Sequence, residues 1–124
     1  MKFLYDYNTL SNALANGKEL MWGFNTTIKR GYNSVHVFYK SQAIATVTPQ
    51  GVRTYRSPLV ISSASGKKRL NSVLREINWA LVTRNGVSFL LYRPTEEVVT
   101  FTGHVICYPN GEYADVDTKP ITKE

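Results

Sequence analysis

The sequence predicts an α+β fold, in which an antiparallel β-sheet carries one principal amphipathic helix and a short N-terminal helix. Three observations lead to this prediction. Several short runs alternate apolar and polar residues, residues 66–77 repeat apolar positions at helical spacing, and Asn85-Gly86 separates two β-rich runs. The chain has 124 residues, 43% of them hydrophobic, which suits one folded unit. We expect a single globular domain over residues 1–114 and an acidic C-terminal tail over 115–124.

The N-terminal part is expected to form a short helix and then an extended segment. Asp6 or Asn8 can cap a helix that continues to about Asn16, and Gly17 then provides a left-handed end. Residues 18–31 are predicted to be extended and partly buried.

A β meander follows, with strands predicted at residues 34–40, 43–48 and 52–56. In the first strand Val35, Val37 and Tyr39 share one face. The opposite face then carries His36, Phe38 and Lys40. Pro49-Gln50-Gly51 is predicted to form a turn, because Pro presets φ and Gly relieves the closing position.

The principal helix is predicted over about residues 66–77, with Ser65 as its cap. Its apolar stripe recurs at i, i+3, i+4 and i+7 and consists of Leu70, Val73, Leu74 and Ile77. Further strands are expected at residues 79–83, 87–92, 98–101 and 104–108, with a turn at Pro109-Asn110-Gly111. The run Phe89-Leu90-Leu91-Tyr92 is apolar on both faces, which indicates a central strand.

Charge is distributed unevenly along the chain. Residues 29–93 hold eleven basic residues and one acid, Glu76, a net of +10, whereas residues 94–124 carry a net of −4. The formal net charge of +6 therefore combines a strongly basic body with an acidic end. This asymmetry points to a phosphate-rich or acidic partner.

The principal helix supplies the first candidate site. Three cations in its predicted first turn, Lys67, Lys68 and Arg69, would oppose the helix dipole by about 0.3–1 kcal/mol each. At 100° per residue, one face collects Lys67, Lys68, Asn71, Ser72 and Arg75. The free N–H groups of a first turn favour anions, so the candidate phosphate-binding residues are Lys67, Lys68, Arg69, Asn71 and Arg75. The alternative is the solvated face of an ordinary amphipathic helix.

A second candidate is a pattern that occurs three times, an aromatic residue beside a cation near a strand end. The pairs are Tyr39-Lys40, Tyr55-Arg56 and Tyr92-Arg93. Rings could stack on the bases of a single-stranded nucleic acid while cations follow its backbone. The alternative is that the tyrosines pack inward and the cations face water, unless the pairs converge on one edge of the sheet.

Patterns typical of catalysis are weak. Cys107 lies in an apolar strand, and alternation places His104 on the other face, where it cannot activate the thiol. His36 is expected to be structural, and the adjacent Glu96-Glu97 cannot share one face of a strand. No metal-ligand spacing and no phosphate-binding loop motif occurs. The sequence predicts a binding protein, with no metal or cofactor, and not an enzyme.

The expected location is intracellular. No run reaches the roughly 20 apolar residues of a membrane span, and the N-terminus does not resemble a signal peptide. The single cysteine excludes an internal disulfide and fits a reducing cytosol. We expect no membrane interaction, and a homo-oligomer remains an open alternative.

The motifs between residues 35 and 92 follow a definite order: a β meander ending in a Gly turn, a Ser-rich cap, a basic-Arg-Leu-Asn helix and a Gly hairpin. The residues that carry it are Gly51, Ser62 to Ser65, Lys67-Lys68-Arg69-Leu70-Asn71 and Asn85-Gly86. This order resembles small accessory proteins of tailed bacteriophages. The resemblance implies a phage origin, an accessory role and action in the host cytoplasm, and it transfers no catalytic residue and no ligand.

Three functions remain open from the sequence. The first is a phage accessory protein that binds a phosphate-rich target, either a nucleic acid, a nucleotide signal or a host nucleoprotein such as a defence complex. Such binding would serve counter-defence or host takeover by occlusion. The second is a general single-stranded nucleic-acid-binding module. The third is a virion structural or assembly protein, in which the basic body of one subunit meets the acidic tail of another.

Overall fold

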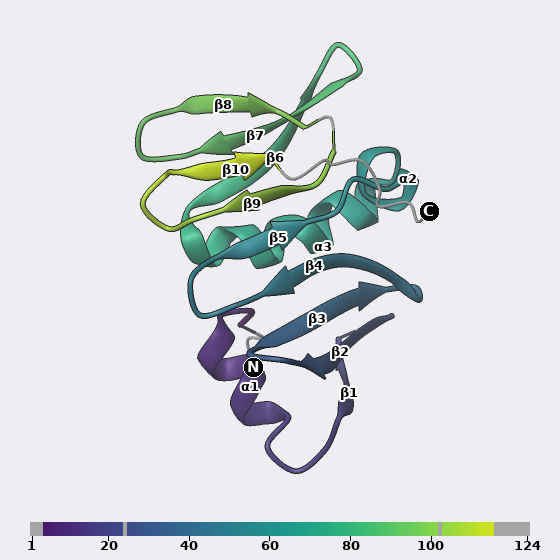
Figure 1. Cartoon of the computed structure of the whole chain (residues 1–124). Helices are drawn as coiled ribbons and strands as arrows, with labels where there is room; N and C mark the ends of the chain where they lie inside the picture. The colour runs from purple at the N-terminus through teal and green to yellow at the C-terminus, as the bar shows by residue number, and fades with distance from the viewer. Residues whose placement is uncertain (1–3, 24, 102, 116–124) are drawn as a thin grey trace, which may run out of the picture.

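A computed structural model describes residues 4–23, 25–101 and 103–115, and it confirms the α+β class (Figure 1). The elements of these residues, in chain order, are α1 (Tyr7–Ala13), β1 (Glu19–Gly23), β2 (Thr26–Gly31), β3 (Ser34–Tyr39), β4 (Gln42–Val47), β5 (Val52–Thr54), α2 (Pro58–Ile61), α3 (Ala64–Leu74), the 3₁₀ turn η1 (Arg75–Ile77), β6 (Trp79–Arg84), β7 (Val87–Tyr92), β8 (Glu97–Thr100), β9 (Val105–Cys107) and β10 (Tyr113–Asp115).

The strands form two antiparallel sheets where the sequence indicated one. The larger sheet has the order β1-β2-β3-β4-β5-β9-β10, and the smaller has the order β6-β7-β8. The helical segment between β5 and β6 carries the chain away from the larger sheet, and β9 later returns to pair with β5. Within the smaller sheet β7 is the central strand, as its apolar run predicts.

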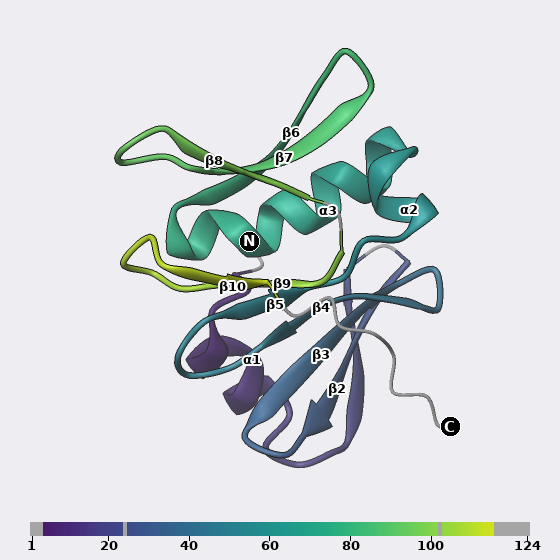
Figure 2. The same ribbon diagram turned by 45° about the horizontal axis from the view of Figure 1, so that its top comes forward.

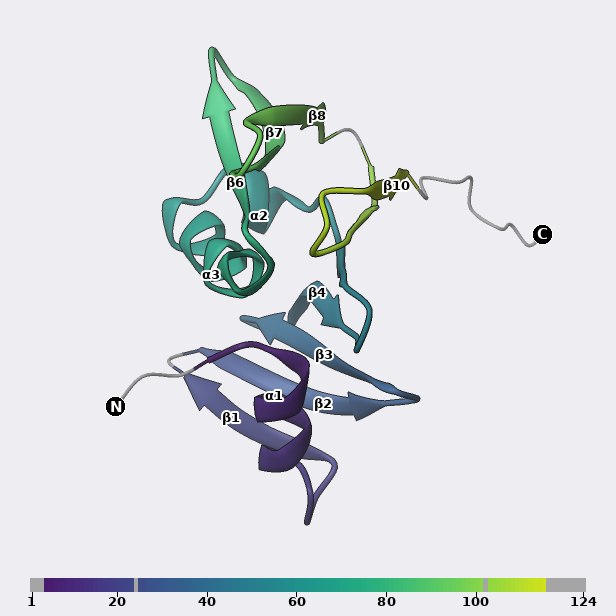
Figure 3. The same ribbon diagram turned by 90° about the vertical axis from the view of Figure 1, so that its left-hand side faces the viewer.

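Helix α3 lies between the two sheets (Figure 2). Its buried side chains Leu70, Val73 and Leu74 belong to one apolar core that also includes Val37 of β3 and Leu90 of β7. Helix α1 packs on β3 and contributes the buried Leu10 to that core, and Leu14, its C-cap residue, is buried there too. Helix α1 and the smaller sheet lie at opposite ends of the molecule (Figure 3).

The larger sheet has one face in the core and one face outside it. In β3 the burial alternates as predicted, with Val35, Val37 and Tyr39 buried and the residues between them only partly buried. Helices α1 and α3 contribute to the same core as these valines, so both helices lie on the inner face. The outer face is therefore the one that carries His36 and Phe38.

Two helix ends differ from the prediction. Asp6 caps α1, but the helix ends at Leu14, and Gly17 does not adopt a positive φ. Helix α3 begins at Ala64, because Ser63, rather than Ser65, accepts a hydrogen bond from the Gly66 N–H.

The glycine turns also divide into two kinds. Asn85 and Gly86 both have positive φ, as the hairpin prediction requires. Gly51 does not, and it is needed because a Cβ there would collide with the carbonyl oxygen of Cys107. Asp115, the first residue of the predicted tail, is the last residue of β10, and the rest of that predicted segment, 116–124, lies outside the described residues.

Candidate functional site

Four of the five residues predicted on the principal helix line one open groove of about 730 Å³. We call this the α3 groove, and it is formed by Ser62, Ala64, Lys67, Lys68, Asn71, Ser72 and Arg75. Two lysines, one arginine and two serines face it, and no Asp or Glu is among these lining residues. The helical spacing therefore identified a real surface that combines positive charge with hydroxyl groups.

The position of the α3 cap changes the electrostatic argument for this groove. Because the helix begins at Ala64, Lys67 and Lys68 lie beyond its first three residues. The unfavourable interaction of a cation with the helix dipole fades over the first turn. These lysines therefore destabilise the helix less than their predicted position in the first turn implied. The Gly66 N–H is also already bonded to Ser63. The cations of the groove therefore favour an anion along the side of the helix.

Arg69 lies on another side of α3, away from the groove. Its guanidinium carbon is 5.4 Å from the centre of the Tyr39 ring, which is a cation–π contact. It also interacts with the Tyr5 hydroxyl: burial raises the pKa of Tyr5, and the nearby Arg69 charge lowers it in part. Arg69 thus holds the N-terminal segment and β3 against the helix, and the prediction that it binds the ligand is not supported by its position.

Asn71 borders the groove, but its amide is already used. The Leu81 N–H donates to Asn71 Oδ1 at 2.6 Å, and Asn71 Nδ2 donates to the Leu81 carbonyl oxygen at 3.2 Å. Leu81 belongs to β6, which is an edge strand of the smaller sheet. Asn71 therefore hydrogen-bonds the backbone groups at the edge of β6. The predicted binding residues that remain for a ligand in the α3 groove are Lys67, Lys68 and Arg75.

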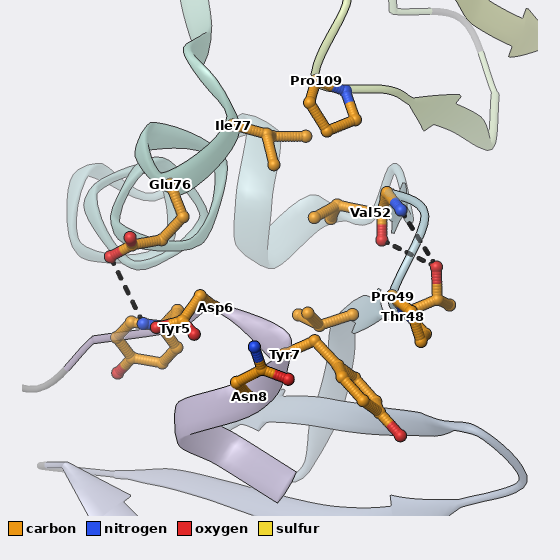
Figure 4. A pocket seen from close by; sticks show the side chains of 12 residues that line it. Tyr5, Asp6, Tyr7, Asn8, Thr48, Pro49, Val52, Glu76, Ile77 and Pro109 are labelled. Carbon is orange, nitrogen blue, oxygen red and sulfur yellow. Dashed lines mark hydrogen bonds between the residues drawn. The ribbon is translucent and has the colours of Figure 1, made fainter.

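Glu76, the one acid among residues 29–93, faces a different cleft. Its carboxylate accepts a hydrogen bond from the Tyr5 N–H at 3.4 Å, in a cleft of about 350 Å³ between α1, the β4–β5 turn and η1 (Figure 4). Asp6 in the same cleft caps α1. Both carboxylates are hydrogen-bonded within the chain, and neither lines the α3 groove.

The three tyrosine–cation pairs do not converge on one edge. Tyr39 and Tyr92 are buried, and the Tyr92 hydroxyl donates to the Pro109 carbonyl oxygen at 2.8 Å. The cations beside them, Lys40 and Arg93, are exposed. The prediction that these two rings stack on bases is therefore wrong, because both rings are packed in the core.

The remaining pair behaves differently. Tyr55 is only partly buried, and its hydroxyl is 2.7 Å from Thr46 Oγ1 on the outer face of the larger sheet. Its neighbour Arg56 donates from Nε to the Phe101 carbonyl oxygen at 2.9 Å, which ties the larger sheet to the segment after β8.

The outer face of the larger sheet holds a second concave surface, which the sequence analysis missed. We call it the sheet-face hollow: a volume of about 440 Å³ lined by Tyr32, Ser34, His36, Thr46, Thr48, Gln50, Arg53, Tyr55, Ile106 and Tyr108. The available signal was the alternation within the strands, because half of these residues occupy outward positions of β3, β4, β5 and β9: Ser34, His36, Thr46, Arg53 and Ile106. Adjacent tyrosine–cation pairs do not reveal this surface, because neighbours in a strand face opposite sides.

The cysteine and the histidines do not form a nucleophile–base pair in the described part of the chain. Cys107 is fully buried, and burial raises the pKa of its thiol to about 12, so it stays protonated at neutral pH. His104 makes an edge-on contact with the Tyr55 ring, with 5.1 Å between ring centroids. Among the described residues, no three His, Cys, Asp or Glu side chains gather in a way that could hold a metal ion.

No helix in the described part of the chain is both long and apolar enough to cross a membrane. Comparison of the chain with models of protein families, with curated proteins and with solved structures found no match.

Proposed function

We propose that this chain is a bacteriophage accessory protein that acts by binding and not by catalysis, with the α3 groove as the surface that engages a phosphate-rich target. The observation that carries the proposal is the grouping of Lys67, Lys68 and Arg75 in one groove without a lining carboxylate. The target class comprises a nucleic acid, a nucleotide signal or a host nucleoprotein, and the biological role would be counter-defence or host takeover.

Two further features support this proposal. The excess of positive charge in residues 29–93 would attract a polyanion over a distance of about 10 Å at moderate salt. The groove also offers the Ser62 and Ser72 side chains beside its cations. Hydroxyl groups and cations together are the usual partners of phosphate oxygens.

The test is a neutralised variant that carries Lys67→Gln, Lys68→Gln and Arg75→Gln. The matched control carries Lys18→Gln, Arg84→Gln and Arg93→Gln, which removes the same charge from exposed positions outside the groove. Each protein is purified from its host without nuclease, and the absorbance ratio at 260 and 280 nm and the co-purifying species are measured. We expect the wild type and the control to retain a phosphate-rich partner and the groove variant to lose it. A groove variant that remains folded and retains the partner would contradict the proposal.

A further inference from the structure

We infer that the sheet-face hollow is a binding platform for single-stranded nucleic acid, on which unpaired bases stack and beside which cations contact the phosphates. The inference goes beyond the proposed function, because it assigns a class of ligand to a second surface. It uses a different surface from the α3 groove, so either conclusion can fail without the other.

The platform is a row of side chains that crosses neighbouring strands. The pairing of β2, β3, β4, β5 and β9 places Lys29, His36, Thr46, Arg53 and Ile106 side by side in that order. Cross-strand neighbours on one face have Cβ atoms about 4.5–5.5 Å apart, so the row forms a continuous strip. A strip that runs across five strands and carries His36 and Arg53 suits an extended strand better than a compact ligand.

Two rings of the hollow, His36 and Tyr55, are held in place before any ligand binds. The Thr46 hydroxyl is hydrogen-bonded to His36 Nδ1 at 2.9 Å and to the Tyr55 hydroxyl at 2.7 Å. The edge-on contact with His104 braces the Tyr55 ring from another side. Rings that are already oriented lose less conformational entropy when a base stacks on them.

Two tyrosines are far enough apart to contact different bases. Arg53 pairs with Ile106 and Val52 with Cys107, so the same register places Tyr108 opposite Gly51. Gly51 precedes Tyr55 by four residues, which corresponds to about 13 Å along an extended strand. Tyr108 lies over Gly51, where the missing side chain leaves room for its ring. The fully exposed Tyr32 ring, 92% accessible, stands at the rim of the same hollow.

The charge of the surface favours a polyanion. Arg53 is exposed in the hollow, and no Asp or Glu is among the residues that line it. Lys29 lies farther along the row, 4.8 Å from the centre of the Phe38 ring, but its ammonium group is 4.0 Å from the carboxylate of its cross-strand neighbour Glu19. Arg53 is therefore the cation that the hollow offers to a phosphate. We choose a single strand over a duplex because a duplex buries the faces of its bases, and these rings can only stack on bases that are unpaired.

The experiment measures binding of a fluorescein-labelled oligothymidylate of about twelve nucleotides by fluorescence anisotropy at low salt. We expect the wild type to bind it, and Tyr55→Leu, Tyr108→Leu and Arg53→Gln each to weaken binding, about five- to hundredfold for the loss of a ring. Tyr55→Phe keeps the ring but loses the hydrogen bond to Thr46, so its affinity should lie between those of the wild type and Tyr55→Leu. Tyr113→Leu is the matched control, an exposed tyrosine outside the hollow.

Several results would overturn the inference. The first is that the wild type does not bind the oligothymidylate, and the second is that the Tyr55, Tyr108 and Arg53 variants bind it as tightly as the wild type. The third is that the wild type binds a duplex of the same length, or thymidine monophosphate, with the same affinity as the single strand. Loss of binding in the α3 groove variant alone would also overturn it while leaving the proposed function intact. Because Arg53 is exposed, Arg53→Gln remains informative even if a tyrosine variant fails to fold. Photocrosslinking of a bromouracil oligomer should label His36, Tyr55 or Tyr108, and labelling confined to α3 would contradict the assignment.

Discussion

Asn71 joins α3 to the open edge of β6 through both ends of its side-chain amide. The Leu81 N–H and carbonyl groups that it satisfies would otherwise face outward from an edge strand without a strand partner. A polar residue at the margin of the groove therefore supports the fold, while Lys67 and Lys68 on the same helix face remain directed into the groove.

Replacing Asn71 by Leu should lower the free energy of unfolding by about 1–3 kcal/mol, because the Leu81 groups lose their partner. Ser72→Ala is the control at the neighbouring groove position. The Ser72 hydroxyl donates to the Lys68 carbonyl oxygen within the helix at 3.1 Å, and its loss should change stability by less than about 0.5 kcal/mol. Urea denaturation measures both, and an Asn71→Leu variant as stable as the wild type would refute this role.

The sequence predicted which residues share a helix face but not which residue each of them contacts. The spacing of Lys67, Lys68 and Arg75 follows from 100° per residue and is correct. Arg69 and Asn71 differ because their partners are supplied by packing: Tyr39 lies thirty positions earlier, and Leu81 lies on a strand whose predicted hairpin partner did not reveal that its other edge faces the helix. Helical periodicity predicts the direction in which a side chain leaves the helix axis. Tertiary contacts decide which of the polar side chains form hydrogen bonds or ring contacts within the protein.

Among the elements, the local signals located most strands and failed where several equivalent signals compete. Ser62, Ser63 and Ser65 are all competent caps, and only the contact with the Gly66 N–H identifies Ser63. The β1–β2 hairpin was read only as an extended segment, because its turn uses Asn25 at a φ of 56° where a glycine would have signalled the turn. The separation into two sheets depends on the return of β9 to β5, a long-range pairing that no local pattern encodes.

The cap of α1 allows a prediction at this scale. Asp6 accepts from the Thr9 N–H at 3.1 Å and from the Thr9 hydroxyl at 2.6 Å. Burial raises the pKa of Asp6, but these hydrogen bonds outweigh it, and the net pKa is lowered. Asp6→Ala should therefore cost about 0.5–2 kcal/mol at neutral pH.

The pH dependence of this cost follows from the direction of the shift. A lowered pKa means that the carboxylate stabilises the fold above its unfolded-state pKa of about 3.9, and that this contribution disappears as the pH falls through the folded-state value. The difference in unfolding free energy between wild type and Asp6→Ala should shrink below about pH 4. Asp6→Asn keeps a capping oxygen without the titration, so its stability relative to Asp6→Ala should not depend on pH in this range. A gap that stays constant down to acid pH would argue against the carboxylate cap.

Across the described part of the molecule, the cations do not form one patch: Lys67, Lys68 and Arg75 line the α3 groove, and Arg53 lines the sheet-face hollow. The α3 groove lies on a helix that packs against the inner face of the larger sheet, and the sheet-face hollow lies on the outer face of that sheet. The larger sheet separates them, so a short strand can occupy only one surface, whereas a long strand or a nucleoprotein can reach both.

This arrangement predicts a dependence of affinity on strand length and salt. For single strands the slope of log affinity against log salt concentration is about −0.7 for each phosphate contact, so Arg53→Gln should reduce the slope for a short oligothymidylate by about that amount. Tyr55→Leu should lower the affinity without changing the slope, because stacking releases no counterions. The α3 groove variant should leave the short strand unaffected and reduce the slope for a long strand by about 2. Anisotropy titrations over a range of salt concentrations would measure these slopes, and a groove variant that weakens the short and long strands equally would show that the two surfaces are not separate.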